Sequence, residues 1–154
     1  EKDIAFYTPD ANLTEVQKAA DLANINSEIE EFPEGYDTEV GERGTRLSGG
    51  QKQRISLARA LVRDPNLLIL DDTLSAVDNI TEKKIVDNIN GVLKEKTSIV
   101  ISHRLSAIRG ADLILFMEDG RVVESGTHQE LMARHGIYAE TYEKQSKEGT
   151  QHEG

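Results

Sequence analysis

The hydrophobic positions near the start of the chain follow the period of an α-helix. Between Thr14 and Glu31 the apolar residues recur about every 3.6 positions, which predicts an amphipathic helix. Thr14 is the expected N-cap of this helix, because Gln17 follows it at the spacing of a capping box. The segment Phe32-Pro33-Glu34-Gly35 has the residues of a turn and is expected to end the helix.

A second helical pattern follows a loop that contains Gly41 and Gly44. This helix is predicted to begin at Ser48-Gly49-Gly50 and to run to about Arg63. Its apolar face consists of Ile55, Ala58, Leu61 and Val62. Asp64-Pro65 is expected to end it, because proline disfavours helical geometry in the residue before it.

The rest of the chain alternates short apolar runs with helical segments. Strands are predicted at Leu67–Leu70, Ser98–Ser102 and Leu113–Met117, and helices at Thr81–Leu93, Thr127–Ala133 and Ile137–Lys144. Asp119-Gly120 is typical of a hairpin turn, which leads to Val122-Val123. Apolar strands separated by helices indicate an α/β fold with a parallel sheet covered on both faces. Residues 147–154 are polar and are predicted to be a disordered tail.

Composition narrows the class of protein. No apolar run among the 154 residues approaches the roughly 18 that a membrane-spanning helix needs. The opening Glu1-Lys2-Asp3 is not that of a signal peptide. The absence of cysteine excludes disulfides and thiolate metal sites. The net charge of −10 argues against nucleic-acid binding through bulk charge.

The start of the second predicted helix has the residues of an anion-binding site. Gly49 and Gly50 allow the backbone to approach a ligand closely, and the N–H groups at a helix start favour negative charge. Ser48 adds a hydroxyl donor, and the basic window from Arg43 to Arg63 holds six basic residues and no acid. The alternatives are structural: Ser48 and Gln51 also fit a plain capping box, and the basic residues fit a solvated helix face.

Acidic residues and a histidine follow the first two predicted strands. Asp71 and Asp72 come directly after Leu67–Leu70, and His103 follows Ser98–Ser102. Parallel strands end at one edge of a sheet, where ligands bind in α/β folds. Asp71 is suited there to hold Mg²⁺, usually through water. The alternatives are that the two acids only open a turn and that the histidine is structural.

Several of these segments resemble the motifs of the ABC transporters. The stretch LSGGQKQRISLARAL, from Leu47 to Leu61, is similar to the ABC signature motif and its helix over its whole length. Asp71-Asp72 resembles the end of the Walker B strand, Ser75-Ala76-Val77-Asp78 resembles the D-loop, and His103 resembles the switch histidine. The segment TEVGERG, at Thr38–Gly44, resembles the X-loop of ABC exporters, which importers and the chromosome and repair ATPases generally lack.

The resemblance implies a role for each motif. The signature residues Ser48, Gly49, Gly50 and Gln51 would contact the γ-phosphate of an ATP held by the opposite subunit, and Ser75 and Asp78 would communicate across that dimer. Asp71 would hold Mg²⁺, and His103 would contact the γ-phosphate. Asp72 stands where the family usually has glutamate as the catalytic base, and its shorter side chain is expected to reach the attacking water poorly.

The resemblance also implies partners and a location. A second nucleotide-binding domain would complete the ATP sites, either in a homodimer or in a heterodimer in which this chain belongs to the degenerate-site subunit. Thr38–Gly44 would contact the coupling helices of a transmembrane domain, which places the chain at the cytoplasmic face of a membrane. No nucleic-acid partner is expected.

The implied fold is part of a larger cassette. A partial RecA-like core (P-loop NTPase type) is expected at residues 64–146, preceded by the ABC helical subdomain at residues 1–63. The phosphate-binding pattern G-x-x-x-x-G-K-[ST] does not occur among the twelve glycines, so that loop and the strand leading to it are expected upstream of Glu1. Two other functions stay open: a non-catalytic interaction module unable to bind ATP alone, and a non-transport ABC ATPase.

Overall fold

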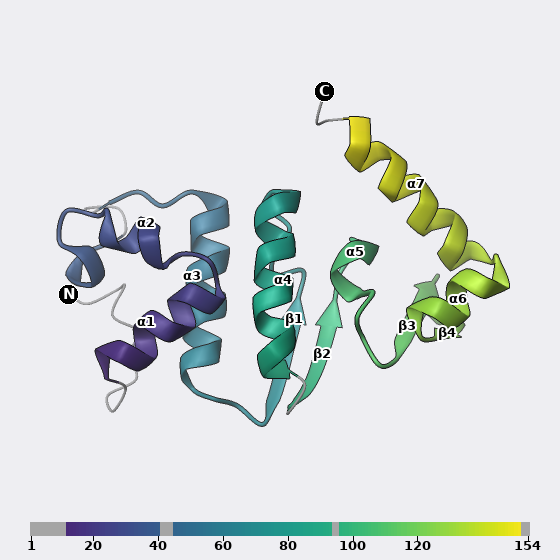
Figure 1. Cartoon of the computed structure of the whole chain (residues 1–154), viewed down its shortest axis with the longest axis horizontal. Coiled ribbons are helices and arrows are strands. Elements are labelled where there is room, and N and C mark those ends of the chain that lie inside the picture. Colours follow the sequence, from purple (N-terminus) through teal and green to yellow (C-terminus); the bar gives the residue numbers. More distant parts are fainter. Residues whose placement is uncertain (1–11, 41–44, 94–95, 152–154) are drawn as a thin grey trace. The chain divides into compact units, whose positions relative to one another are not determined.

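The computed structural model describes residues 12–40, 45–93 and 96–151, in two compact units that divide between Ile101 and Ser102 (Figure 1). Each unit has a hydrophobic cluster of its own, which accounts for the division. Ile55 and Leu68, on the two sides of the domain boundary predicted at residue 63, belong to one hydrophobic cluster. The boundary itself stays a prediction.

The first unit begins with three helices, and the third of them carries the predicted signature segment. They are α1 (Leu13–Leu22), α2 (Asn26–Glu30) and α3 (Gly49–Val62), with a short 3₁₀ turn, η1 (Gly35–Asp37), after α2. The start and end predicted for α3 are confirmed, since Ser48 is its N-cap and Arg63 its C-cap.

The long helix predicted from Thr14 to Glu31 is wrong in two respects. Its N-cap is Asn12, whose side chain accepts the N–H of Glu15 at 3.0 Å while Glu15 accepts the N–H of Asn12 at 3.1 Å. The helix also breaks between α1 and α2, where Asn24 has a φ of 51°. Asparagine is one of the few residues that adopt this left-handed geometry at little cost, so it allows the chain to turn there.

A parallel strand pair stands beside the helices of the first unit. Strands β1 (Leu67–Asp71) and β2 (Thr97–Ile101) are in register and are connected through α4 (Asn79–Leu93), so the predicted parallel sheet is confirmed. Leu68 and Leu70 are buried in one cluster with residues of α4, which runs alongside β1 in Figure 1. The alternate residues of β1 and all residues of β2 are exposed, so the described residues of this unit bury one face of β1 and neither face of β2. The covering of both faces of the sheet stays a prediction.

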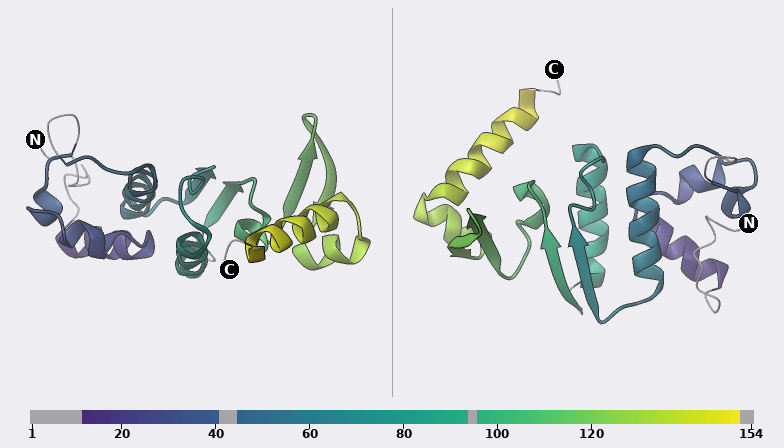
Figure 2. Two further views of the ribbon diagram at one scale, coloured as in Figure 1. Left: turned by 90° about the horizontal axis from the view of Figure 1, so that it is seen from above. Right: turned by 180° about the vertical axis from the view of Figure 1, so that it is seen from behind.

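The second unit is a hairpin packed against helices. It comprises α5 (Leu105–Ile108), β3 (Ile114–Glu118), β4 (Arg121–Gly126), α6 (His128–Arg134) and α7 (Ile137–Gln151), as Figure 2 also shows. The predicted hairpin turn is confirmed, since Asp119 and Gly120 have φ of 47° and 74°, the geometry that two-residue turns favour. Strands β2 and β3 belong to separate sheets.

The last helix is longer than expected. Helix α7 runs to Gln151, so residues 147–151 are helical, whereas the sequence predicted a disordered tail from residue 147. The helix is anchored by Tyr138, which is fully buried, and no proline follows to interrupt it. Once a helix is nucleated, each added residue gains a hydrogen bond at low cost, which carries it into a polar segment. None of the helices in the described ranges is long and apolar enough to cross a membrane.

Candidate functional site

Helix α3 begins with a capping box and two glycines. Ser48 Oγ accepts the N–H of Gln51 at 3.1 Å, and Gln51 Oε1 accepts the N–H of Ser48 at 2.9 Å. The N–H groups of Gly49 and Gly50 have no acceptor within the helix, as in the first turn of any α-helix. The structural and the anion-binding interpretations of this segment are therefore compatible, because the cap leaves those donors for a ligand.

The two glycines allow the helix start to approach the loop that precedes α4. A Cβ atom added to Gly50 would lie 3.0 Å from the carbonyl oxygen of Ala76, which is tighter than side chains normally pack. A Cβ atom on Gly49 would lie 3.5 Å from the Ala76 Cβ, an ordinary contact. Gly50 is therefore the position where the close approach requires glycine.

The predicted D-loop, residues 75–78, is fixed at both of its ends. The Gln53 amide of α3 holds its beginning through Ser75 and Ala76. At its end, Asp78 Oδ1 accepts the N–H groups of Ile80 and Thr81 at 3.1 and 2.9 Å, which caps α4. These hydrogen bonds, that from Thr81 foremost, lower the pKa of Asp78, so the carboxylate is charged at neutral pH.

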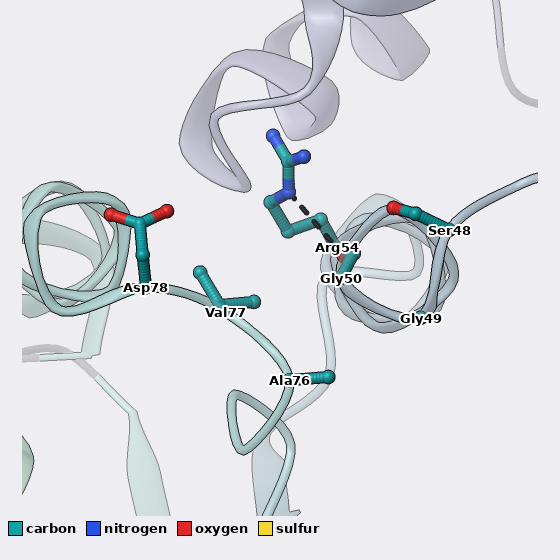
Figure 3. A pocket seen from close by; sticks show the side chains of 7 residues that line it. All are labelled: Ser48, Gly49, Gly50, Arg54, Ala76, Val77 and Asp78. Carbon is teal, nitrogen blue, oxygen red and sulfur yellow. Dashed lines mark hydrogen bonds between the residues drawn. The ribbon is translucent and has the colours of Figure 1, made fainter.

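A hollow of about 330 Å³ opens between the helix start and this loop (Figure 3). Its lining consists of Ser48, Gly49, Gly50, Arg54, Ala76, Val77 and Asp78. The structure thus brings together four of the predicted site residues, Ser48, Gly49, Gly50 and Asp78. Gln51 and Ser75 do not line the hollow; they form the hydrogen bonds that hold its two walls. The hydroxyl and backbone donors at the helix start suit an anionic group such as a phosphate, whereas the charged Asp78 lies across the hollow from them (Figure 3).

Sequence reasoning missed Glu28, which is joined to the same helix start. Glu28 Oε1 and Oε2 accept from Arg54 Nη1 and Nη2 at 2.5 and 3.1 Å, and Oε2 also accepts from Gln51 Nε2 at 3.0 Å. A signal was present in the sequence, because Arg54 lies one turn before Ala58 on the apolar face of the predicted helix. A cation on a buried face needs an acid from another element, and Glu28 supplies it.

These contacts change the acidity of Glu28. Burial raises the pKa of its carboxyl group, but the hydrogen bonds from Arg54 and Gln51 and the charge of Arg54 outweigh burial, so the pKa lies below its ordinary value of 4.5. Arg54 is thus the buried member of the basic window, and its partner Glu28 is half-buried. The other described members are exposed, as the solvated-face interpretation predicted: Arg46, Lys52, Arg59 and Arg63.

Asp71 and Asp72 lie at the carboxyl end of β1, as predicted. Both are exposed, and the N–H of Asp72 donates to the carbonyl oxygen of Ile101 at 2.9 Å. Asp72 has a φ of 46°, so this residue also turns the chain. No cluster of three or more histidine, cysteine or acidic residues that suits a metal occurs in the described ranges. A Mg²⁺ ion on the exposed Asp71 carboxylate therefore requires further oxygen ligands, such as phosphates and water.

His103 belongs to the second unit. Its carbonyl oxygen accepts from Gln145 Nε2 at 2.9 Å, and the residue as a whole is exposed. It follows β2 in the sequence as predicted, but the two acids lie in the first unit. The convergence of His103 with Asp71 therefore stays a prediction.

The predicted X-loop lies partly outside the described residues. Thr38 is buried and its hydroxyl accepts the N–H of Glu34 at 3.1 Å. Val40 pairs with Thr45 in an isolated bridge, which brings the two ends of the loop together. Residues 41–44, which complete the motif, lie outside the described ranges.

Comparisons with known proteins agree on one family. The sequence profile of the ABC transporter family matches residues 3–75. A relative from Bacillus subtilis, named as a probable multidrug resistance ABC transporter ATP-binding/permease protein, is 51% identical over 144 residues, which are 94% of this chain and 25% of that protein. ABC transporter B family member 19 of Arabidopsis thaliana is 46% identical over 149 residues, 97% of this chain and 12% of that protein.

The structural comparison gives the same result. The structure of a bacterial Atm1-family ABC exporter with ATP bound matches with a TM-score of 0.79 and 45% identity, over 92% of this chain and 25% of that chain. The chain therefore spans a quarter or less of the length of these relatives. The order of helices and strands, the signature segment and these similarities have one explanation: the chain belongs to the ABC transporter family, as part of a nucleotide-binding domain of the exporter type.

Proposed function

We propose that the chain is part of the ATP-hydrolysing machinery of a membrane exporter, and that Ser48–Gln51 completes an ATP site held by a second nucleotide-binding domain. The observation that supports this role is the open hollow at the start of α3, lined by Ser48, Gly49 and Gly50. Its backbone donors, hydroxyl group and helix dipole favour an anion that enters from outside the chain. The terminal phosphate of ATP has that chemistry.

A second half-site is assigned to the chain's own nucleotide. Asp71, exposed at the end of β1, is the residue that we assign to Mg²⁺, which neutralises phosphate charge when bound. Asp72 would orient the attacking water, and His103 would donate to the terminal phosphate. Because aspartate is shorter than the glutamate usual at this position, we propose that this site hydrolyses ATP slowly and that the partner's site carries most of the turnover.

The proposed partners follow from the exporter type. Thr38–Gly44 is the segment that we assign to the coupling helices of a transmembrane domain, at the cytoplasmic face of the membrane. The buried Thr38 and the bridge between Val40 and Thr45 support this, because they give the loop fixed ends from which to make contact.

The test of the signature role compares two substitutions on one helix in the full-length transporter. Ser48→Arg places bulk and a misplaced charge in the hollow, and we expect ATP turnover to fall at least about tenfold. Ser56→Arg adds the same side chain at an exposed position of α3 and serves as the matched control. Equal turnover in the two variants would rule out the proposed role of Ser48.

A second candidate function is an interaction module without catalysis of its own. It is favoured by the lack of the phosphate-binding pattern among the glycines of this sequence. Backbone donors and the lysine of that loop normally supply much of the charge stabilisation in phosphoryl transfer, so the 154-residue chain alone is expected not to hydrolyse ATP. Phosphate release by the purified chain that disappears in Ser48→Arg would contradict this expectation.

A further inference from the structure

Glu28 joins two elements of the first unit at the proposed phosphate site. It lies on α2, and its carboxylate contacts Gln51 and Arg54 of α3. We propose that Glu28 is a positioning residue that fixes the geometry of the signature segment Ser48–Gln51 toward the phosphate. This inference rests on the function proposed above, and it adds a residue outside the motif to the machinery of that site.

The first connection runs from Glu28 through the Gln51 side chain to Ser48. Gln51 Nε2 donates to Glu28 Oε2 at 3.0 Å, while Gln51 Oε1 accepts the N–H of Ser48 at 2.9 Å. Both ends of one amide are therefore used, and the carboxylate determines which end faces the helix start. Without that acceptor, the Gln51 amide can rotate away from Ser48, and the backbone donor of Ser48 loses its fixed direction.

The second connection runs from Glu28 through Arg54 to the backbone of Gly50. Arg54 Nε donates to the Gly50 carbonyl oxygen at 3.3 Å, and Nη1 donates to the Asn24 carbonyl oxygen at 2.7 Å. The Arg54 side chain is 11% exposed, so it is held in a single place. Since Arg54 also lines the hollow, the bidentate pair with Glu28 keeps its guanidinium bound to the wall.

The charges of the Glu28–Arg54 pair are a second reason to assign the positioning role to Glu28. A guanidinium that loses its carboxylate partner in a largely buried position is costly and seeks another anion. In the hollow such anions are the Asp78 carboxylate and, in the proposed function, the incoming phosphate. Glu28 thus sets both the direction of the donors at the helix start and the charge that the hollow presents.

The test uses the full-length transporter with its partner and measures kcat and KM for ATP together with the thermal unfolding midpoint. Glu28→Gln replaces the acceptor of Gln51 and Arg54 with an amide, and we expect kcat to fall about tenfold, the effect of losing a charge-assisted hydrogen bond that positions a reacting group. Glu31→Gln, at an exposed position at the end of α2, is the matched control and is expected to leave kcat unchanged.

A conservative substitution separates positioning from stability. Glu28→Asp keeps a carboxylate as acceptor for Gln51 and Arg54, and it leaves every residue of the signature segment unchanged. We expect kcat of Glu28→Asp to lie closer to the wild type than that of Glu28→Gln. This variant also provides the readout if Glu28→Gln alone fails to fold.

The outcomes distinguish this inference from the proposed function. If Ser48→Arg abolishes turnover while Glu28→Gln lowers only the unfolding midpoint, Glu28 is structural and the inference is overturned. A folded Glu28→Asp variant that is as slow as Glu28→Gln overturns it as well. If Ser48→Arg itself leaves turnover intact, the proposed function fails first, and the inference fails with it.

Discussion

Gln53 Oε1 lies 2.8 Å from the backbone nitrogen of Ala76 and accepts its N–H. The other end of the same amide, Nε2, donates to Ser75 Oγ at 2.8 Å. One side chain of α3 therefore holds the backbone and the side chain of the segment that resembles the D-loop. Because Ser48 and Gly50 are on the same helix, a displacement of either wall of the hollow is transmitted to the other.

Substitution of Gln53 tests this connection. Gln53→Leu keeps the volume of the side chain and removes both hydrogen bonds, which at about 1 kcal/mol each should destabilise the chain by about 2 kcal/mol. In the full-length transporter, ATP turnover should fall several-fold, because the loop no longer moves with α3.

Gln53→Glu provides the matched control. Its carboxylate can still accept the Ala76 N–H, and the Ser75 hydroxyl can reverse its role and donate. Turnover and urea denaturation midpoints close to the wild type are expected. If ATP turnover of Gln53→Leu also equals that of the wild type, the connection between α3 and the loop does not contribute to function.

Substitution of the two glycines of α3 by alanine should affect the stability of the chain differently. Gly49→Ala meets only an ordinary contact and gains helix propensity, so it should stabilise the chain by up to about 1 kcal/mol. Gly50→Ala places a Cβ atom 3.0 Å from the Ala76 carbonyl oxygen, so it should be neutral or destabilising and should displace the loop. Chemical denaturation of the purified chain measures both, and equal changes would contradict the close approach.

Much of this site could be predicted from the sequence, because most of its residues are close neighbours along the chain. The cap at Ser48, the start of α3 and the acids at the end of β1 all follow from local pattern, and the structure confirms their positions. The hairpin at Asp119-Gly120 is confirmed for the same reason. Such features depend on a few adjacent residues and on the geometry that those residues favour.

The parts that sequence reasoning missed depend on contacts between distant residues. Glu28 stands 26 residues before Arg54, and nothing local to either residue pairs them. The break at Asn24 interrupts a continuous helical pattern, because packing of Ala23 and Ile25 in the core outweighs the preference for one helix. The cap at Asn12 could not be chosen from the sequence, because Asn12 with Glu15 and Thr14 with Gln17 both have the spacing of a capping box.

The lowered pKa of Glu28 predicts how its contribution to stability depends on pH. A carboxyl group whose pKa is lower in the folded than in the unfolded state stabilises the fold above the unfolded value of 4.5, and this contribution is lost as the pH falls through the folded value. Glu28→Gln should therefore be less stable than the wild type at neutral pH, and the two should converge well below pH 4.5. Urea denaturation across that range measures the difference. A gap that stays constant down to the lowest pH would show that the charge of Glu28 is not involved.

Asp72 allows its charge to be removed without disturbing the backbone. It has a φ of 46°, a geometry that asparagine also tolerates, so Asp72→Asn should leave stability unchanged. If the site that Asp72 serves is already slow, ATP turnover of the assembled transporter should change by less than about twofold. Complete loss of hydrolysis in Asp72→Asn would show that Asp72 is a working catalytic residue and that the two sites are not unequal.

Nucleotide trapping shows on which subunit's ATP Ser48 acts; we propose that it acts on nucleotide held by the other subunit. In dimers in which this chain alone carries Ser48→Arg, a photoreactive ATP analogue is trapped with vanadate, and the label on each polypeptide is measured. We predict that the label on the partner polypeptide is lost, and that the weaker label on the substituted polypeptide stays at its level in the unsubstituted dimer. The matched Ser56→Arg dimer should keep both labels. Loss of the label from the substituted polypeptide, with the partner's label intact, would show that Ser48 serves its own chain's nucleotide.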